Sequence, residues 1–563
     1  MERIINRTTK NLSLKTFTTA DVTQEYINAL NDYTVVKYTE ARHHKWDRES
    51  VDRYIRESNI KGQSELIGIF LRNSGKHIGN IRLSGMNAHH KRVDLGILIH
   101  DKTFWSKGIG TEAIIEVADY VFNELELHKI CADYYSVNHA SARMFNKAGF
   151  QVEGVYKDHF LFENGYVDSI RVGLVFKPFE KSEESAKLKI PSAGPSITYK
   201  EIELVTEAVT QGWYTNMNMH LDQFVKEFTE YSERKYILPT SSCTVAIHLA
   251  LLALGIGPGD EVIVPDISWV ASAAPVHYVR GIPVFADIDP KTWCLTAETF
   301  EAKISDRTKA VVVVDLLGGM PSDMDKILKI AHDHDILVIE DVAEGLGTEY
   351  RGKKAGVFGD ISVYSFNATK LVIGGQGGVI ATDNKNWYEK FKLLQHHGID
   401  RAREGKYYWS YEIGYNYQWT NMQSALTLAQ LRRIEELIEN RRQRGMWYKE
   451  RLEDLGNIHF NYDKPPIKNS YWIVTAIYDK KFGITKEKLM KKFKKYNIDL
   501  RPFFYPISSM PAYTQYCEDK DMEKINPISY SIAPYGICFP SAMSVTESEV
   551  NFVCEKFKEV LFE

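Results

Sequence analysis

Short apolar runs alternate with longer, apolar-periodic segments through the last two-thirds of this 563-residue chain. Ala310–Val314 and Ile336–Ile339 consist of apolar, mostly β-branched residues, which predict strands buried on both faces. Tyr236–Leu254 predicts a short strand, a polar turn at 242–244 and an apolar helix. Strands that alternate with helices predict an α/β fold with a mostly parallel sheet, whose ligand sites lie at the carboxyl ends of the strands.

The first third of the chain carries a different α/β pattern, in which a strand hairpin precedes a glycine-containing turn. Gly108 and Gly110 fall between a strand and an apolar-periodic helix at Ile114–Phe122. This arrangement favours a pyrophosphate at the helix N-terminus, where free N–H groups point at the anion, although an ordinary helix start has the same pattern. The expected strands are Leu66–Leu71, His77–Leu83, Val93–Ile99, Lys129–Tyr135 and, after a helix that begins near Asn138, Gln151–Tyr156.

Residues 180–189, which separate the two patterns, are polar and charged and lack apolar periodicity. A chain of 64.7 kDa is also longer than one hydrophobic core usually organises. We therefore predict an N-terminal domain over residues 1–179, an exposed linker over 180–189 and a second domain over 190–563.

Composition narrows the class of protein. The net charge is −4 with 26% charged residues, so no basic surface suggests a nucleic-acid partner. The six cysteines are scattered without a CxxC pair, which argues against a disulfide framework or a zinc site and fits a reducing compartment. Neither a signal peptide nor a membrane-spanning apolar run is visible. We expect a cytoplasmic protein with no membrane partner.

One lysine is prominent in the stretch Ser362–Gly378, where a β-branched and aromatic strand runs into a glycine-rich turn. Lys370 in this place can form a Schiff base with a carbonyl if its pKa is lowered or if it is held near its target. An isolated lysine after a strand is usually an ordinary surface residue. The assignment of Lys370 therefore depends on the residues that accompany it.

The accompanying residues match the needs of pyridoxal 5′-phosphate, which are a lysine imine, an acid for the ring nitrogen, a flat stacking surface and a phosphate cup. Asp341 ends an apolar strand and would favour the protonated ring nitrogen by about 1–3 pKa units. Trp269 offers the flat surface. Taken singly, Asp341 could cap a helix and Trp269 could belong to the core. The expected phosphate cup consists of Cys243, Thr244 and Ser365, of which Cys243 alone would pass for a buried small residue.

The second domain resembles the DegT-type sugar aminotransferases, which are fold-type-I enzymes that use pyridoxal phosphate. The resemblance rests on the motifs ALGIGPGDEVI at 253–263, GIPVFADIDP at 281–290, EDVAEGLGT at 340–348, SFNATK at 365–370, GYNYQWTNMQSA at 414–425 and RPFFYP at 501–506. It implies a large domain with a mostly parallel sheet and a small C-terminal α/β domain. It also implies transfer of an amino group, usually from glutamate, to a keto sugar carried on a nucleotide.

The same resemblance assigns further residues. Glu344 would lie beside the ring oxygen of the cofactor, and Asn416 would reach the phosphate of the cofactor in a neighbouring subunit, which implies a homodimer. The chain departs from the family pattern at three places: Gln376 replaces a glutamate after the lysine, Cys243 replaces a glycine in the phosphate turn, and Gln418 replaces an arginine.

The first domain resembles the GNAT acyltransferases, particularly their RimL/RimJ-like branch, through WSKGIGTEA at 105–113 and the N-x-x-S…K-x-GF pattern at 138–150. The resemblance implies acetyl-CoA as a cosubstrate. Trp105 stands where the family usually has Gln or Arg. Phe145 stands where a tyrosine often protonates the leaving thiolate. By the resemblance, the backbone of Lys107, Gly108, Ile109, Gly110 and Thr111 would hold the pyrophosphate, and Asn138 and Ser141 would line the cofactor arm.

Asp94, on the strand before the glycine motif, is a candidate general base that would take a proton from an attacking amine, although it could equally be a solvated strand carboxylate. The two resemblances together predict a bifunctional enzyme that aminates a nucleotide-linked keto-deoxysugar and then acetylates the new amine for a surface polysaccharide or glycan. Two alternatives remain. The first domain could acetylate an unrelated amine or a protein N-terminus, or it could only sense acetyl-CoA.

Overall fold

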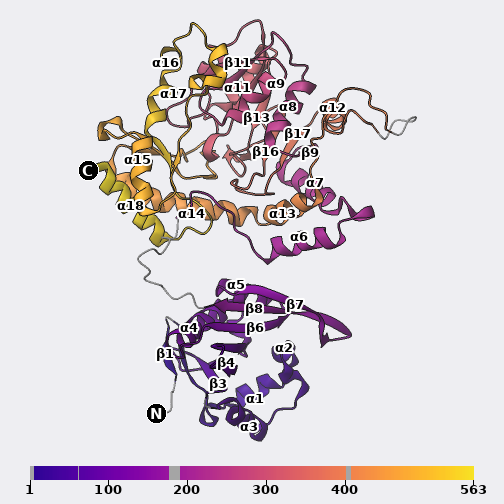
Figure 1. The fold of residues 1–563 in the computed structure, drawn as a ribbon, viewed down its shortest axis with the longest axis vertical. Coiled ribbons are helices and arrows are strands. Elements are labelled where there is room, and N and C mark those ends of the chain that lie inside the picture. The colour runs from indigo at the N-terminus through magenta and orange to yellow at the C-terminus, as the bar shows by residue number, and fades with distance from the viewer. Residues whose placement is uncertain (1–4, 10, 61, 176–189, 401–407, 563) are drawn as a thin grey trace. The chain divides into compact units, whose positions relative to one another are not determined.

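The computed structural model describes residues 5–9, 11–60, 62–175, 190–400 and 408–562 (Figure 1). The chain divides into two compact units, residues 1–185 and 186–563. This division falls inside the segment predicted as a linker, whose residues 180–189 lie outside the described ones. No helix in the described part of the chain combines the length and the apolarity that crossing a membrane requires.

The described residues of the first unit form an eight-stranded sheet in which β5 and β6 are the one parallel pair. These two strands pair only from Arg92↔Lys129 to Asp94↔Cys131, so their ladder stops after Asp94 and leaves the rest of the facing edges unpaired. In sheet order the strands are β1 (Asn6–Thr8), β2 (Leu12–Thr16), β3 (Glu65–Leu71), β4 (His77–Asn87), β5 (Arg92–Ile99), β6 (Lys129–Tyr135), β8 (Gly165–Val175) and β7 (Gln151–Phe162).

Helix α4 (Ile109–Asn123) follows β5, and its N-cap residue is Gly108, whose φ of 80° lies in the left-handed region that favours glycine. Its start lies five residues before the predicted one, because the glycine turn is itself the first turn of the helix. Val117 and Val121 on the same helix are fully buried in the core beneath the sheet. The other helices of this unit are α1 (Gln24–Leu30), α2 (Tyr33–Val36), α3 (Arg48–Ser58) and α5 (His139–Lys147).

Two buried histidines make the stability of the first unit sensitive to acid. The rings of His77 and His100 lie 4.7 Å apart, and burial lowers the pKa of His77 to about 3 and that of His100 to about 4. In the unfolded chain both histidines take up a proton near pH 6.5. Their contribution to the free energy of unfolding is therefore fully present above that pH and is lost as the pH falls toward 4. We expect each histidine to remove about 2 kcal/mol at pH 5.

Hydrogen–deuterium exchange of the whole protein measures this effect on peptides from residues 62–175, after correction for the pH dependence of intrinsic exchange. The free energy of opening should fall between pH 7 and pH 5. Substitution of the exposed His43 by alanine should leave that decrease unchanged. An opening free energy that is equal at the two pH values would contradict the expectation.

The second unit contains the mostly parallel sheet that the sequence predicted. Strand β17 runs antiparallel to both of its neighbours, and the other six strands share one direction. Their carboxyl ends therefore meet at one edge, where ligands bind in such sheets. In sheet order the strands are β11 (Ile282–Ala286), β10 (Glu261–Pro265), β12 (Thr308–Val314), β13 (Leu337–Asp341), β16 (Ile361–Ser365), β17 (Gly378–Thr382) and β9 (Tyr236–Thr240).

Helices cover this sheet, and a smaller sheet forms a second α/β part near the C-terminus (Figure 1). The four strands of the smaller sheet are β18 (Ile458–Phe460), β20 (Thr475–Tyr478), β22 (Gly536–Cys538) and β21 (Arg501–Pro502). The principal helices are α6 (Tyr199–Gln211), α7 (Met219–Ser232), α8 (Cys243–Ala253), α11 (Met324–Asp333), α12 (Lys385–Gln395), α13 (Asn421–Leu431), α14 (Ile434–Leu452), α15 (Lys486–Phe493) and α18 (Glu547–Phe562).

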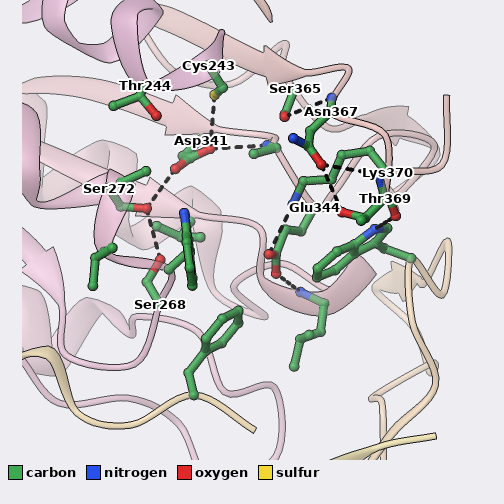
Figure 2. A pocket seen from close by; sticks show the side chains of 18 of the residues that line it. Cys243, Thr244, Ser268, Ser272, Asp341, Glu344, Ser365, Asn367, Thr369 and Lys370 are labelled. Carbon is green, nitrogen blue, oxygen red and sulfur yellow. Dashed lines mark hydrogen bonds and ion pairs between the residues drawn. The ribbon is translucent and has the colours of Figure 1, made fainter. Parts of the chain in front are cut away.

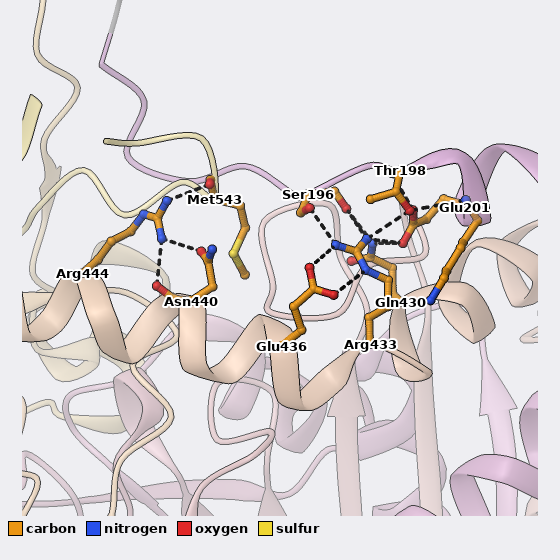
Figure 3. Close-up of polar contacts among 10 residues, drawn as sticks. Ser196, Thr198, Glu201, Gln430, Arg433, Glu436, Asn440, Arg444 and Met543 are labelled. Atoms are coloured by element: carbon orange, nitrogen blue, oxygen red, sulfur yellow. Dashed lines mark hydrogen bonds and ion pairs between the residues drawn. The ribbon is translucent and has the colours of Figure 1, made fainter. Parts of the chain in front are cut away.

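A buried ion pair links α6, near the start of the second unit, to the start of α14, and a hydrogen bond links α6 to α13 (Figure 3). Glu201, in the first turn of α6, accepts hydrogen bonds of 2.7 Å from Arg433 Nη1 and from Gln430 Nε2. Arg433 also donates to Glu436 at 2.8 Å. Since the Glu201 side chain is almost fully buried, removing Arg433 would leave this buried carboxylate without its cationic partner.

Candidate active site

Lys370 lies in the turn that follows β16, and its side chain is held on two sides. Nζ donates a hydrogen bond to Glu344 Oε1 at 3.2 Å and stands 3.9 Å from the centre of the Trp472 ring. Trp472 is itself fixed, because its indole N–H donates to the carbonyl oxygen of Thr369 at 2.9 Å. The lysine nitrogen is thus held in one place by a carboxylate and an aromatic face before any ligand binds (Figure 2).

Glu344 is buried, and burial raises the pKa of its carboxyl, while the Lys370 charge and the N–H of Leu317 oppose that rise. The Leu317 N–H donates to Glu344 Oε2 at 3.1 Å. Leu317 has a φ of 55°, a strained value for a leucine, and the Asn461 amide holds its carbonyl at 2.9 Å. Oε2 of Glu344 thus bonds the backbone N–H of Leu317, and Oε1 bonds Lys370.

Asp341 ends β13 at the carboxyl edge of the sheet and is only 3% exposed. Three donors surround its carboxylate (Figure 2): Ser272 Oγ at 2.8 Å, the Ala343 N–H at 3.1 Å and Cys243 Sγ at 3.8 Å. Burial raises the pKa of Asp341 above its usual value, and these hydrogen bonds and the Lys370 charge limit that rise. Among the described residues, Asp341 forms no ion pair at all.

A cavity of about 500 Å³ brings most of the predicted residues of the second unit together. Its lining includes Cys243, Thr244, Trp269, Asp341, Glu344, Ser365 and Lys370. Asn416 does not line it; this residue is exposed and pairs with His396 in an isolated bridge. Arg501 and Trp472, to which the sequence reasoning gave no role, also line the cavity. Tryptophan and arginine are frequent outside sites, so neither was distinctive in the sequence.

The Cys243 side chain does not point where the sequence reasoning placed it. Its thiol is directed at Asp341, so the contribution of this residue to a phosphate cup would be its backbone N–H in the first turn of α8. Burial raises the pKa of the thiol well above its usual value, so Cys243 is a neutral hydrogen-bond donor here. The hydroxyl of Ser365 accepts a hydrogen bond from the Asn367 N–H at 3.4 Å and lies at the cavity wall.

The residues of this cavity fit pyridoxal 5′-phosphate. A buried carboxylate without a cationic partner matches a protonated ring nitrogen, and a lysine amine lies in the same cavity. The indole of Trp269 is 59% exposed although it lines the cavity, so one of its surfaces is available for stacking. The N-terminal turn of α8 supplies N–H groups to a phosphate.

The first unit has a cavity of about 460 Å³ where β5 and β6 part. It is lined by Gly108, Ile109, Gly110, Thr111, Asn138, Ser141 and Phe145, together with Leu95–Ile99. Of the predicted residues, Lys107 does not line it, although both of its neighbours in the turn do. A Cβ at Gly110 would come within 2.5 Å of Met144 Sδ, so α4 and α5 approach closely at this glycine.

Asp94 is not among the residues that line this cavity. Its carboxylate accepts a hydrogen bond of 2.6 Å from Arg171 Nη2, and the same guanidinium also contacts Asp133. The structure therefore places Asp94 in an ion-pair cluster at the position where β5 still pairs with β6. The sequence could not reveal this arrangement, because Arg171 lies 77 residues further along the chain.

Comparison with known proteins defines the class to which the chain belongs. Residues 195–558 match the model of the DegT/DnrJ/EryC1/StrS aminotransferase family, and residues 11–151 match that of the acetyltransferase (GNAT) domain. The chain belongs to the DegT/DnrJ/EryC1/StrS aminotransferase family and carries a GNAT acetyltransferase domain before the aminotransferase domain. Pyridoxal 5′-phosphate is the cofactor of this family, and acetyl-CoA is the cosubstrate of the GNAT domain.

Three individual proteins illustrate the likeness. The GDP-perosamine synthase of Escherichia coli O157:H7 is 35% identical over 370 residues, covering 66% of this chain and 98% of that protein. The spore coat polysaccharide biosynthesis protein SpsC of Bacillus subtilis is 32% identical over 381 residues, covering 66% of this chain and 97% of that protein. The X-ray structure of the aminotransferase from Psychrobacter cryohalolentis has a TM-score of 0.61 and 25% identity, covering 66% and 98%.

Proposed function

We propose that the protein aminates a nucleotide-linked keto-deoxysugar, with glutamate as the amino donor, and acetylates the resulting amine with acetyl-CoA. The observation that supports the amination is that Lys370, Glu344 and Asp341 line one cavity in a member of an aminotransferase family. The likeness to proteins named for GDP-perosamine and for spore coat polysaccharide supports a nucleotide sugar as acceptor and a surface polysaccharide or glycan as the destination.

In the amination, bound pyridoxal phosphate supplies an electron sink for the pair left when the substrate α-proton departs. Lys370 would hold the cofactor through its amine, and the same amine would move the α-proton. Asp341 would keep the ring nitrogen charged, and Glu344 holds the lysine amine by a hydrogen bond. Trp269 would stack on the ring, and the start of α8 would bind the phosphate.

In the acetylation, the first unit would bind acetyl-CoA in the cavity between β5 and β6. The turn 107–111 would hold the pyrophosphate at the N-terminus of α4, and Asn138 and Ser141 would line the cofactor arm. Asn138 is placed for this by its own helix, since it caps α5 and its side chain contacts Ser141 at 2.9 Å. Asp94 stays a predicted general base, although its carboxylate accepts a hydrogen bond from Arg171 and does not line the cavity.

The second unit is proposed to act as a homodimer in which Asn416 completes the cofactor site of the partner. Support comes from apolar side chains that a single chain leaves in water, among them Tyr214 (93% exposed) and Ile413 (91% exposed). Asn416 itself is exposed and does not line the cavity of its own chain. An Asn416→Ala variant that forms dimers should bind the cofactor more weakly.

The proposed function is tested by giving the protein a nucleotide-linked 4-keto-6-deoxyhexose and glutamate, with and without acetyl-CoA, and identifying products by mass spectrometry. We expect the amino sugar without acetyl-CoA and the acetamido sugar with it. If no amine forms, the aminotransferase proposal is wrong. If the amine forms and stays unacetylated, the coupling of the two reactions is wrong.

The two activities are separated by a matched variant. Lys370→Ala should acetylate amino sugar that is supplied ready-made, because the acetyl-CoA cavity lies in the other unit. Peptides and small amines are offered in parallel as acceptors. Faster acetylation of a peptide N-terminus than of the amino sugar would favour an unrelated acceptor, and acetyl-CoA binding without turnover would favour a sensor.

A further inference from the structure

Two aspartates lie at the carboxyl ends of neighbouring strands of the large sheet, but among the described residues only one of the two carboxyl groups has hydrogen-bond donors. Asp315 follows β12 and Asp341 ends β13, and the Asp315 N–H donates to the Asp341 backbone carbonyl at 3.0 Å. Both carboxyl groups are buried, at 0% and 3% exposure. Within residues 190–400 and 408–562, neither carboxyl oxygen of Asp315 has a hydrogen-bond partner, whereas Asp341 has three donors.

This difference determines which of the two carries a charge. A buried carboxylate without donors takes up a proton, and burial together with the nearby Glu340 and Asp341 raises the pKa of Asp315 well above its usual value. Burial raises the pKa of Asp341 as well, but its donors and the Lys370 charge limit that rise, because hydrogen bonds to a carboxylate favour the ionised form. The negative charge that a protonated ring nitrogen needs is therefore located on Asp341 by its donors, not by the sheet edge alone.

Ser272 is the closest of the three donors, and it is itself oriented. Its hydroxyl lies 2.8 Å from Asp341 Oδ2 and 2.9 Å from the hydroxyl of Ser268, and both serines are almost fully buried (Figure 2). Ser268 can donate to Ser272, which then donates to Asp341. The third donor, Cys243, is weaker because a neutral thiol at 3.8 Å contributes less than a hydroxyl.

We propose that Ser272, oriented by Ser268, is a positioning residue that keeps Asp341 ionised and thereby sets the protonation of the cofactor ring. The inference rests on the proposed aminotransferase function. It adds that the Ser272 hydroxyl controls the charge of Asp341, the residue proposed to contact the ring nitrogen. The other charged or titratable groups around Asp341 are Lys370, Glu344, Cys243, Asp315 and Glu340. None of them is altered by replacing Ser272, so a change after replacement reports the hydroxyl.

The test compares Ser272→Ala with Ser272→Thr, which keeps the hydroxyl. The visible absorbance of the cofactor bound to Lys370 is titrated with pH, without sugar or acetyl-CoA. In Ser272→Ala, a smaller fraction of Asp341 is ionised, so the ring nitrogen is protonated to a smaller extent. A less protonated ring withdraws fewer electrons, so the pKa of the lysine–cofactor imine should rise by about one pH unit. The half-reaction with glutamate should slow by about tenfold, mostly in kcat, and Ser272→Thr should restore both values.

Ser268→Ala provides a second variant that only loosens the orientation of Ser272, and a smaller shift in the same direction is expected. Equal imine pKa values in the parent and both alanine variants would overturn the inference. Equal defects in Ser272→Ala and Ser272→Thr would also overturn it, because they would point to packing. If the parent binds no cofactor, the aminotransferase proposal itself fails, and the two failures are thus distinguishable.

Discussion

Lys370→Ala is expected to reduce amination of the nucleotide sugar by at least about 10³-fold. The variant loses both the covalent attachment of the cofactor and the base that moves the α-proton, and proton transfer alone is worth about 10²–10⁴-fold. The turn should keep its shape, because Trp472 is anchored to the carbonyl of Thr369 and not to the lysine side chain. Single-turnover conversion of the cofactor with glutamate measures the effect without the sugar.

The matched control for this prediction is Lys329→Ala, which removes an exposed lysine paired with Asp333 on α11. Such a surface pair contributes little to stability, so the control should turn over at the parental rate. Amination by Lys370→Ala within tenfold of the parent would show that another residue performs the chemistry. Hydrogen–deuterium exchange of peptides from residues 190–400 should match the parent, which shows that the second unit of the variant is folded.

Asp341→Asn is expected to give the second largest effect, a loss of about 10- to 10³-fold in the glutamate half-reaction. The amide keeps the shape of the carboxyl group but removes the charge that favours a protonated ring nitrogen by about 1–3 pKa units, at about 1.4 kcal/mol for each unit. The loss should appear in kcat more than in KM, because the ring charge matters most when electrons flow into the ring.

The control for this substitution is Asp315→Asn, because burial raises the pKa of that neighbouring carboxyl well above its usual value and so favours its neutral form. It should bind the cofactor with the parental spectrum, whereas Asp341→Asn should change the spectrum. If both variants had the same activity as the parent, the assignment of Asp341 to the ring nitrogen would be wrong.

Local sequence singled out the candidate site residues that lie on one strand and its following turn, and the residues that accompany them supported the assignment. Asp341 could be found because it ends an apolar run, and Lys370 because it lies between a β-branched strand and glycines. The parallel sheet followed from the alternation of strands and helices. These features depend on residues that are close together in the chain.

The features that sequence reasoning missed depend on contacts between distant segments. Trp472 reaches the lysine turn across 103 residues, and Arg171 reaches Asp94 across 77. The direction of the Cys243 thiol is decided by the position of β13 relative to α8, which no local pattern specifies. Ser272 resembles any serine in a turn until Asp341 is placed beside it.

The most direct measurement is reduction of the cofactor-loaded protein with borohydride, followed by peptide mass spectrometry. A reduced Schiff base leaves a stable phosphopyridoxyl group on the lysine that formed it. We predict that this group is found on Lys370, and that glutamate added before the reduction removes it. A label on any other lysine, or a Lys370 peptide that remains unmodified, would contradict the account.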